Sequence, residues 1–233
     1  MFDTGQPVRI AVVDRSTVPM GVDLHALVVA LQQYVDGFVA PAWGAPATLV
    51  ESKDLLRGHW AMVFLDDADA PGALAYHDLT PDGLPVSKVF VRTTLEAGGK
   101  VSVSASHELV EMLVDPAINL YSTGPRRGVM YAYESADPVE ETDFPVRGIA
   151  MSNFVLPSYF ETFRKKGSDR FDAMGLVSKP FELLKGGYQI LFVKGRFTQV
   201  FGSAAKARRF AEEDRRGHRS EIRRLRRGGP RGR

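Results

Sequence analysis

The sequence predicts a mixed α/β (α+β) fold, whose first half is a single layer of strands and helices. Residues 8–14 (VRIAVVD) form a short apolar run rich in β-branched side chains, which is typical of a buried strand. Residues 24–38 carry apolar side chains at helical spacing, and further strand-like runs follow before a second helical stretch. The chain has 233 residues, of which 44% are hydrophobic and 25% charged, so it can form one or at most two globular domains. This composition excludes a wholly disordered chain, a collagen-like fibre and a coiled coil.

The elements of the first half follow from the local sequence. Asp23 is expected to cap the helix at 24–38, and Pro41 is expected to end it, because proline has no amide hydrogen to continue a helix. Apolar runs predict further strands, and the segment TPDGLP has the composition of a turn. These strands are expected at 47–52, 60–67, 72–79 and 87–94.

A second helix is predicted from about Ser102 to Val114. Gly98 and Gly99 interrupt the chain before it, and Pro116 closes it because the residue before a proline avoids the helical region. The rest of the chain is less regular, with strands expected between segments rich in Pro and Gly. These strands are expected at 128–135, 145–151 and 188–193.

Charge is distributed unevenly along the chain. Residues 206–233 contain twelve Lys and Arg against four Asp and Glu, whereas residues 1–205 contain eighteen against twenty-four. We therefore expect one domain at 1–202 and a basic, flexible C-terminal tail at 203–233. Arginine pairs in the tail could contact the phosphates of a nucleic acid, because guanidinium is fork-shaped and always charged. The tail could instead be a solvated helix with local ion pairs, or could bind an acidic protein.

Some classes of protein and site are excluded by what the sequence lacks. The chain has no cysteine, so disulfides, thiol catalysis and Cys-ligated zinc are excluded, and any metal must be held by His, Asp and Glu. No apolar run approaches the ~18 residues that a membrane span needs. The N-terminal sequence has no basic leader before an apolar core. We therefore expect a cytoplasmic protein with neither a signal peptide nor a membrane partner.

The most informative segment runs from 104 to 116 and contains the pattern His-Glu-x-x-Glu. His107 and Glu111 are four residues apart, so on a helix they lie about 40° apart in azimuth and ~6 Å apart along the axis. The same spacing lets the two histidines of His-Glu-x-x-His bind zinc, which also accepts carboxylate ligands. Glu108 is at the position that in this pattern takes the proton of metal-bound water. The segment therefore predicts a zinc site with Glu108 as its catalytic base.

The helix that carries these groups is otherwise apolar. Ionisable groups on a buried helix need partners, and a metal ion is an efficient one. The alternative is a buried network of hydrogen bonds between His107 and the glutamates. Either arrangement accounts for charged residues among Leu109, Val110 and Met112.

The third metal ligand is expected about twenty residues beyond the helix. Glu134 is favoured as ligand, with Asp137 orienting His107 or serving in place of Glu134, although both could simply face solvent. Asp115 is ~12 Å from His107 along a straight helix, so it is expected to have another partner: an arginine, a backbone donor or a contact behind the ligands. Tyr131 and Tyr133 could contact the substrate or its oxyanion, although aromatic residues on a strand more often belong to the core.

Two further histidines could line a site. His59 follows a glycine and precedes a tryptophan, and His77 stands between a tyrosine and an aspartate in a predicted strand. A lone histidine in a strand is more often a hydrogen-bonded structural residue, so neither is assigned a role.

The segment resembles a pattern found in zincin-type metallopeptidase-like proteins. One group with a similar pattern is the Exordium-like proteins of plants, and many bacterial and phage proteins are similar. The match covers roughly residues 102–140. The matching residues are Ser106, His107, Glu108, Leu109, Glu111, Asp115, Pro116, Tyr121, Glu134 and Asp137.

This resemblance implies a zincin-like fold, with a twisted mixed sheet, a backing helix and an active-site helix. It implies His107 and Glu111 as metal ligands and Glu108 as the base. It also implies that an edge strand just before the active-site helix holds an extended peptide by strand addition, which would be the strand at 87–94. The chain departs from the family in having Glu111 rather than a second histidine, and Val114 where that group often has threonine.

These observations favour a zinc-dependent hydrolase acting on a peptide or protein substrate. Zinc would polarise the carbonyl group, and Glu108 would carry the proton. One alternative is a non-catalytic structural or assembly protein, for example of a phage particle, that retains the metal site. Another is a nucleic-acid-associated protein that binds through its arginine-rich tail.

Overall fold

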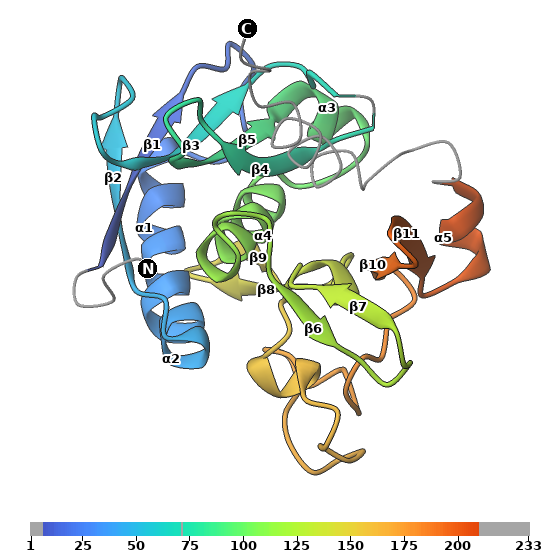
Figure 1. Ribbon diagram of the computed structural model, residues 1–233. Helices are drawn as coiled ribbons and strands as arrows, with labels where there is room; N and C mark the ends of the chain where they lie inside the picture. The colour runs from blue at the N-terminus through green and yellow to red at the C-terminus, as the bar shows by residue number, and fades with distance from the viewer. Residues whose placement is uncertain (1–6, 71, 210–233) are drawn as a thin grey trace, which may run out of the picture.

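The computed structural model describes residues 7–70 and 72–209, and the first half of this range forms a five-stranded mixed sheet (Figure 1). The strand order is β2-β1-β3-β5-β4, and β4 is antiparallel to its neighbour while the other four strands are parallel. The predicted mixed α/β class is confirmed. The strands are β1 (Val8–Asp14), β2 (Ala47–Ser52), β3 (Trp60–Leu65), β4 (Ala75–Leu79) and β5 (Pro85–Phe90).

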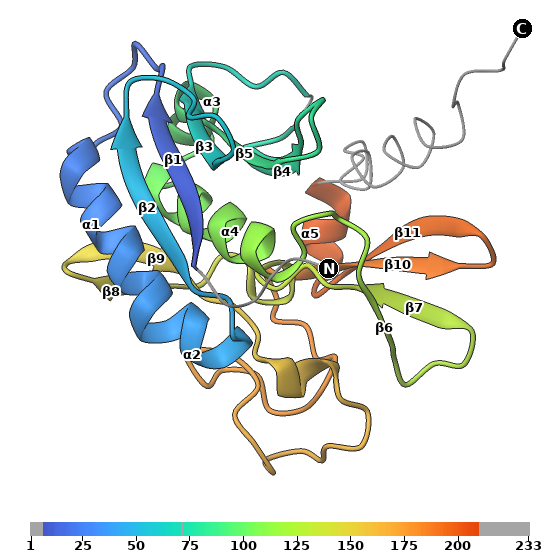
Figure 2. The same ribbon diagram turned by 60° about the vertical axis from the view of Figure 1, so that its left-hand side comes forward.

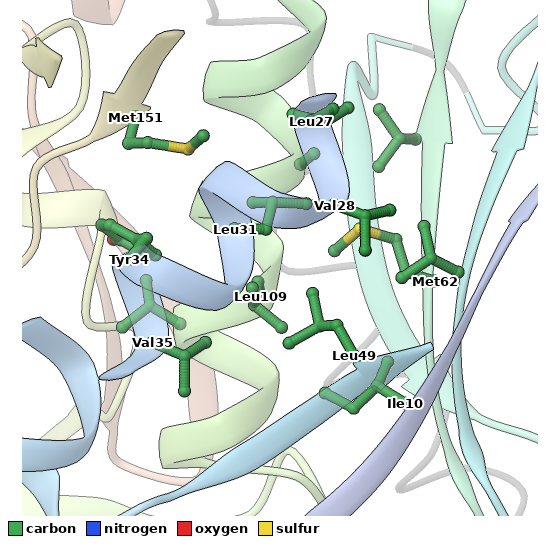
Figure 3. Packing of buried hydrophobic residues seen from close by; sticks show 14 of the residues in the cluster. Ile10, Leu27, Val28, Leu31, Tyr34, Val35, Leu49, Met62, Leu109 and Met151 are labelled. Carbon is green, nitrogen blue, oxygen red and sulfur yellow. The ribbon is translucent and has the colours of Figure 1, made fainter. Parts of the chain in front are cut away.

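Two helices, α1 (Leu24–Tyr34) and α4 (Val101–Val114), pack together under the same face of this sheet (Figure 1). Asp23 caps α1 as predicted, since its carboxylate accepts a 2.9 Å hydrogen bond from the amide of Ala26. Strand and helix side chains meet in one apolar core, where α4 contributes the fully buried Leu109 (Figure 3). A short helix, α3 (Val91–Glu96), links the sheet to α4.

The second half of the chain forms a smaller antiparallel sheet in the order β11-β10-β7-β6, on the other side of α4 (Figure 2). A separate hairpin, β8-β9, packs against α4. Thus α4 lies between the two halves of the molecule. The elements of this half are β6 (Tyr121–Thr123), β7 (Val129–Ala132), η2 (Asp137–Val139), β8 (Asp143–Val146), β9 (Ile149–Ser152), η3 (Pro157–Phe160), β10 (Tyr188–Val193), β11 (Arg196–Phe201) and α5 (Ala204–Arg209).

The first helix does not end at Pro41, contrary to the prediction. A π-helical turn, η1 (Val35–Val39), follows α1, and a last helical turn, α2 (Ala40–Trp43), contains the proline. In the wider turn the amide of Ala40 donates to the carbonyl of Val35, five residues back. The helix can therefore pass through the proline, and it ends at Gly44, which has a left-handed φ of 65°.

The strand predicted at 145–151 is a hairpin instead. Arg147 and Gly148 have φ values of 52° and 78°, the conformation of a tight turn that needs a positive φ at both positions. The chain therefore reverses between β8 and β9. Glycine readily adopts this conformation but arginine rarely does, so the local sequence gave little indication of the turn.

The strand predicted at 87–94 is shorter than expected and is not at the edge of the sheet. The chain becomes helical at Val91, and β5 lies between β3 and β4. The predicted turn at TPDGLP is present and connects β4 to β5. Because β5 pairs with β3 on its other side, β4 is the outermost strand. Any peptide added to this edge would meet β4 rather than 87–94.

The described fold continues beyond the predicted boundary at residue 202. Helix α5 begins at Ala204, and the side chain of Lys206 is only 4% exposed, bound to the carboxylates of Glu140 and Glu141. The predicted contacts of the arginine-rich tail with phosphates or an acidic partner depend mainly on residues 210–233, which lie outside the described residues. None of the helices in the described ranges is both long and apolar enough to cross a membrane.

Candidate metal centre

Helix α4 presents His107, Glu108 and Glu111 to the space between the two sheets. The apolar side of the helix, including Leu109 and Met112, is buried in the core. On the other side, His107 and Glu111 face η2 in the second half of the chain, whereas Glu108 faces β4. Glu108 and Glu111 are buried, and the side chain of His107 is 13% exposed. The helical spacing thus places the three polar groups as predicted.

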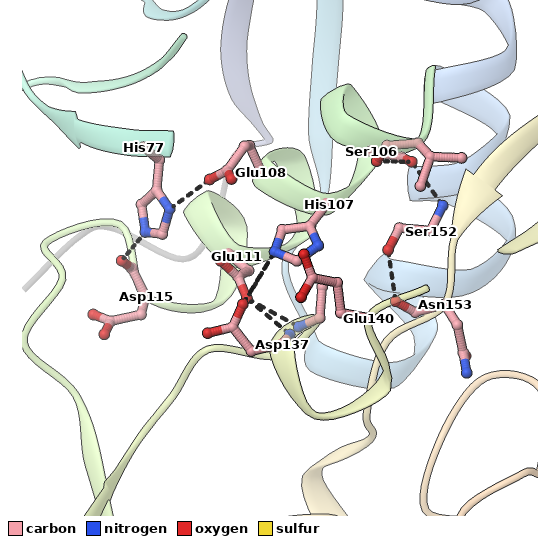
Figure 4. A network of polar contacts seen from close by, with 12 residues as sticks. His77, Ser106, His107, Glu108, Glu111, Asp115, Asp137, Glu140, Ser152 and Asn153 are labelled. Carbon is pink, nitrogen blue, oxygen red and sulfur yellow. Dashed lines mark hydrogen bonds and ion pairs between the residues drawn. The ribbon is translucent and has the colours of Figure 1, made fainter. Parts of the chain in front are cut away.

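A carboxylate from the second half completes a group around His107. The Nε2 atom of His107 lies 3.2 Å from Asp137 Oδ1 and 3.6 Å from Glu111 Oε1 (Figure 4). One potential ligand atom from each of the three residues lies within 4.8 Å of the other two. One nitrogen and two oxygen donors around a common point could hold a metal ion. Three protein ligands of these kinds are also what a catalytic zinc site usually has.

Glu111 also fixes the turn that carries Asp137. Its Oε1 atom accepts hydrogen bonds from the backbone amides of Ala136 and Asp137, at 3.0 Å and 3.3 Å. Asp137 is the first residue of η2. Glu111 therefore holds the side chain of Asp137 beside α4, and these two residues would share a metal ion. The two segments of the site are therefore joined even without an ion.

The carboxylate of Asp137 has an unusual environment. Its Oδ1 atom is buried and makes no hydrogen bond with any residue that the structure describes, although His107 Nε2 is 3.2 Å away. Buried carboxylate oxygens are normally hydrogen-bonded, because leaving them unsatisfied is costly. A cation between the two atoms would satisfy both, so the residues fit a metal ion.

The three groups strongly perturb each other's protonation. Burial and the nearby Asp137 carboxylate together raise the pKa of Glu111 to about 8, against the opposing effect of His107. Burial also raises the pKa of Asp137, to about 6, although His107 lowers it. Burial alone would lower the pKa of His107, but the charge of Glu111 and the nearby Asp137 hold that pKa well above its usual range. Strongly perturbed pKa values are therefore concentrated at this point, as they are at many functional sites.

Glu108 is bound to a histidine from the edge strand. His77 on β4 places Nδ1 3.2 Å from Glu108 Oε2 and Nε2 3.3 Å from the carbonyl oxygen of Asp115 (Figure 4). Both side chains are more than nine-tenths buried. His77 is thus part of the site, although the sequence alone favoured a structural role for it.

These residues line a cavity of about 600 Å³ between the two halves of the molecule. Its wall includes His77, His107, Glu108, Glu111 and Asp137 from the site. A cavity of this size can hold a short peptide segment or a small ligand, which is typical of an enzyme site.

The chain matches no protein-family model, no curated protein and no solved structure. The assignment of a function therefore depends on the residues of this site.

The other predicted site residues take different places. Glu134 is buried in the same cavity, and its charge raises the pKa values of Glu111 and Asp137, but it is in neither of the two clusters of potential ligands found among the described residues. Asp115 has backbone donors, one of the three kinds of partner expected for it: its carboxylate accepts hydrogen bonds from the amides of Asn119 and Leu120. Asp115 therefore anchors the loop after α4.

The two tyrosines pack in apolar clusters and are not among the residues that line the cavity. Tyr131 lies against Phe181, with ring centroids 4.7 Å apart. Tyr133 stacks on Phe160 at 4.2 Å with nearly parallel rings. Their positions are those of core residues, the alternative that the sequence also left open.

A supporting contact of the site was not recognised in the sequence. The turn at Gly186 and Gly187 packs against η2, and a Cβ atom at Gly187 would overlap the carbonyl oxygen of Pro138. The amide of Leu184 donates to the same carbonyl at 3.1 Å. The glycine pair predicted a turn correctly, but only the fold brings that turn against the segment that carries Asp137.

Proposed function

We propose that this protein is a zinc-dependent hydrolase of the zincin-like type, with His107, Glu111 and Asp137 as its metal ligands. The observation that carries the proposal is the buried Oδ1 atom of Asp137, which faces His107 Nε2 without a hydrogen bond. The donor set of one imidazole and two carboxylates suits zinc. Asp137 is preferred to Glu134 as the third ligand because its oxygen lies with the other two.

Zinc bound at this point would polarise a substrate carbonyl and lower the pKa of a water molecule. The proton transfers would be carried out by a residue of the protein. Glu108 is one residue from His107 on α4 and lines the same cavity, so it can accept a proton from the attacking water. It can then return that proton to the leaving amine. Glu108, Glu111 and Asp137 are buried, which limits their contact with solvent and strengthens these electrostatic interactions.

A peptide is the substrate that the surrounding structure favours. The edge strand β4 borders the cavity, and in the described residues its outer side is not paired with another strand. Strand addition at such an edge would hold an extended peptide across the site. The order of a mixed sheet, a packed helix and then the ligand-bearing helix is consistent with the zincin resemblance noted in the sequence.

The test combines metal content with hydrolysis. The purified full chain without a tag is expected to contain about one zinc ion, measured by mass spectrometry, and His107→Ala is expected to lose it. Glu108→Gln should keep the metal and reduce peptide hydrolysis by roughly 10²–10⁴-fold, the usual contribution of a general base. Absence of metal from the wild-type protein after zinc is supplied would refute the proposal.

The same variants separate hydrolysis from a purely structural metal site. A structural or assembly protein would lose thermal stability in His107→Ala but would show no hydrolysis for Glu108→Gln to reduce. Asp143→Asn is the matched control, because Asp143 lines the same cavity but is paired with Lys100 at 2.9 Å. This variant should retain both metal and activity.

A further inference from the structure

His77 connects the edge strand to both the proposed base and the end of its helix. It is 5% exposed, and it reaches from β4 across the cavity wall to α4. Nδ1 faces Glu108 Oε2 at 3.2 Å, and Nε2 faces the carbonyl oxygen of Asp115 at 3.3 Å (Figure 4). Each nitrogen therefore has one oxygen partner.

Both partners of the ring accept hydrogen bonds. A backbone carbonyl cannot donate, and an ionised carboxylate can only accept. Both nitrogens of His77 can make good contacts only if each carries a hydrogen, so the ring is an imidazolium. Burial would lower the pKa of His77, but the hydrogen bond to Glu108 and the charge of Glu134 outweigh burial and raise it to about 9.

We propose that His77 is a positioning residue for Glu108, holding its carboxylate by a charged hydrogen bond between Nδ1 and Oε2. This inference rests on the proposed function and adds a residue to its machinery. Because Oε2 is bound to His77, Oε1 is the oxygen that accepts the proton from water. The second hydrogen bond, to the carbonyl of Asp115, fixes the ring itself relative to α4.

The alternative role for His77 is that of a metal ligand. His77, Glu108 and Glu111 also place potential ligand atoms within 4.8 Å of one another. Metal binding requires a free lone pair on one ring nitrogen. Both nitrogens face oxygen acceptors at hydrogen-bonding distance, which favours two N–H groups and hence a positioning role.

The kinetic test uses His77→Gln in the full-length, metal-loaded protein with a peptide substrate. We expect kcat to fall by roughly 10–100-fold, as for other residues that orient a group at a metal site, with KM changed by less than about threefold. Added to Glu108→Gln, the same substitution should cause no further loss, since the residue it positions has gone. Unchanged kcat, or fully additive losses, would overturn the proposal.

The matched control is His25→Gln. His25 also pairs its Nδ1 atom with a glutamate oxygen at 3.2 Å, that of Glu51, but its side chain is 77% exposed, and His25 is not among the residues that line the cavity. This variant should leave kcat, KM and metal content unchanged.

Two readouts do not require turnover. Zinc stoichiometry should stay at one ion per chain in His77→Gln, whereas a second ion in the wild type that this variant loses would make His77 a ligand and overturn the proposal. In ¹⁵N-labelled wild type, nuclear magnetic resonance should detect slowly exchanging N–H groups at both ring nitrogens, with the Nδ1–H signal shifted or lost in Glu108→Gln. A His77 ring nitrogen without a hydrogen would also overturn the proposal. If the wild type binds zinc but hydrolyses no peptide, the proposed function fails, and the resonance test alone decides whether His77 holds Glu108.

Discussion

Asp137 and Glu134 are both buried carboxylates in one cavity, but it is Asp137 that belongs to the group of potential ligand atoms around His107. Asp137→Asn is therefore expected to weaken zinc binding by more than the roughly 10–100-fold seen for residues behind the ligands. Glu134→Gln should cause a smaller loss, because it removes only nearby negative charge. Isothermal titration calorimetry would measure both affinities, and the reverse order would return the ligand role to Glu134.

The sequence predicted part of this site because helical geometry depends only on spacing. His107 and Glu111 converge, and Asp115 has a backbone partner, as helix periodicity and the position at a helix end indicated. The sequence favoured Glu134 over Asp137 as the third ligand from spacing alone, but the choice depends on where η2 turns, which spacing does not reveal. His77 contacts Glu108, which lies thirty-one residues further along the chain, and no local sequence pattern reveals this contact.

At the level of elements, the turn at Gly187 supports the segment that carries Asp137. Gly187→Ala is expected to push η2 away from α4, because the added methyl group would overlap the Pro138 carbonyl. We expect a loss of about 1–3 kcal/mol in the free energy of unfolding, as for other overpacked sites, together with weaker zinc binding. Thermal or urea unfolding and zinc titration would measure these effects.

Gly37→Ala provides the matched control for this substitution. Gly37 lies in the π-helical turn, where an added Cβ would have no atom within 4 Å and the backbone φ is not positive. Gly37→Ala should increase the free energy of unfolding by about 0.4–1 kcal/mol, because alanine reduces the conformational entropy of the unfolded chain. A loss of stability at Gly37 equal to that at Gly187 would contradict the steric explanation.

Some helices and strands could be predicted from the sequence more accurately than others. Strands β1 and β2 and the cap at Asp23 follow from local apolar runs and capping chemistry, and they lie at the predicted residues. Strands β6 and β11 were missed because one has three residues and the other is mostly half-buried, so each depends on its partner strand. The hairpin turn at Arg147 needs a positive φ that arginine seldom adopts.

For the whole molecule, the site couples metal binding to pH. Glu111 and Asp137 have pKa values raised to about 8 and 6, and that of His107 is also raised. Glu111 and His107 therefore hold protons near neutral pH, and Asp137 also holds one below about pH 6. Zinc must displace them, and its affinity should therefore rise with pH from about 6 to 8. Calorimetry in buffers of different ionisation enthalpy would measure the protons released. A pH-independent affinity would contradict this coupling.

Metal-free protein should show the opposite trend in stability. The pKa of Glu111 is higher in the folded chain than its ordinary value near 4.5, so folding retains a proton that the unfolded chain releases. The free energy of unfolding should then fall as pH rises from about 4.5 to 8. Urea unfolding across this range would test it, and Glu111→Gln should have a shallower dependence.

The hydrogen bonds that Glu111 accepts from the amides of Ala136 and Asp137 bear on how the two halves of the molecule open locally. These two hydrogen bonds join α4, which packs under the five-stranded sheet, to the segment that packs against β10. We expect the two halves to open as distinct cooperative units, and zinc bound to Glu111 and Asp137 would raise the free energy of that opening. Hydrogen exchange should show it: chelation would speed exchange at 134–141 and in β10, while the amides of β1 and β3 stay protected.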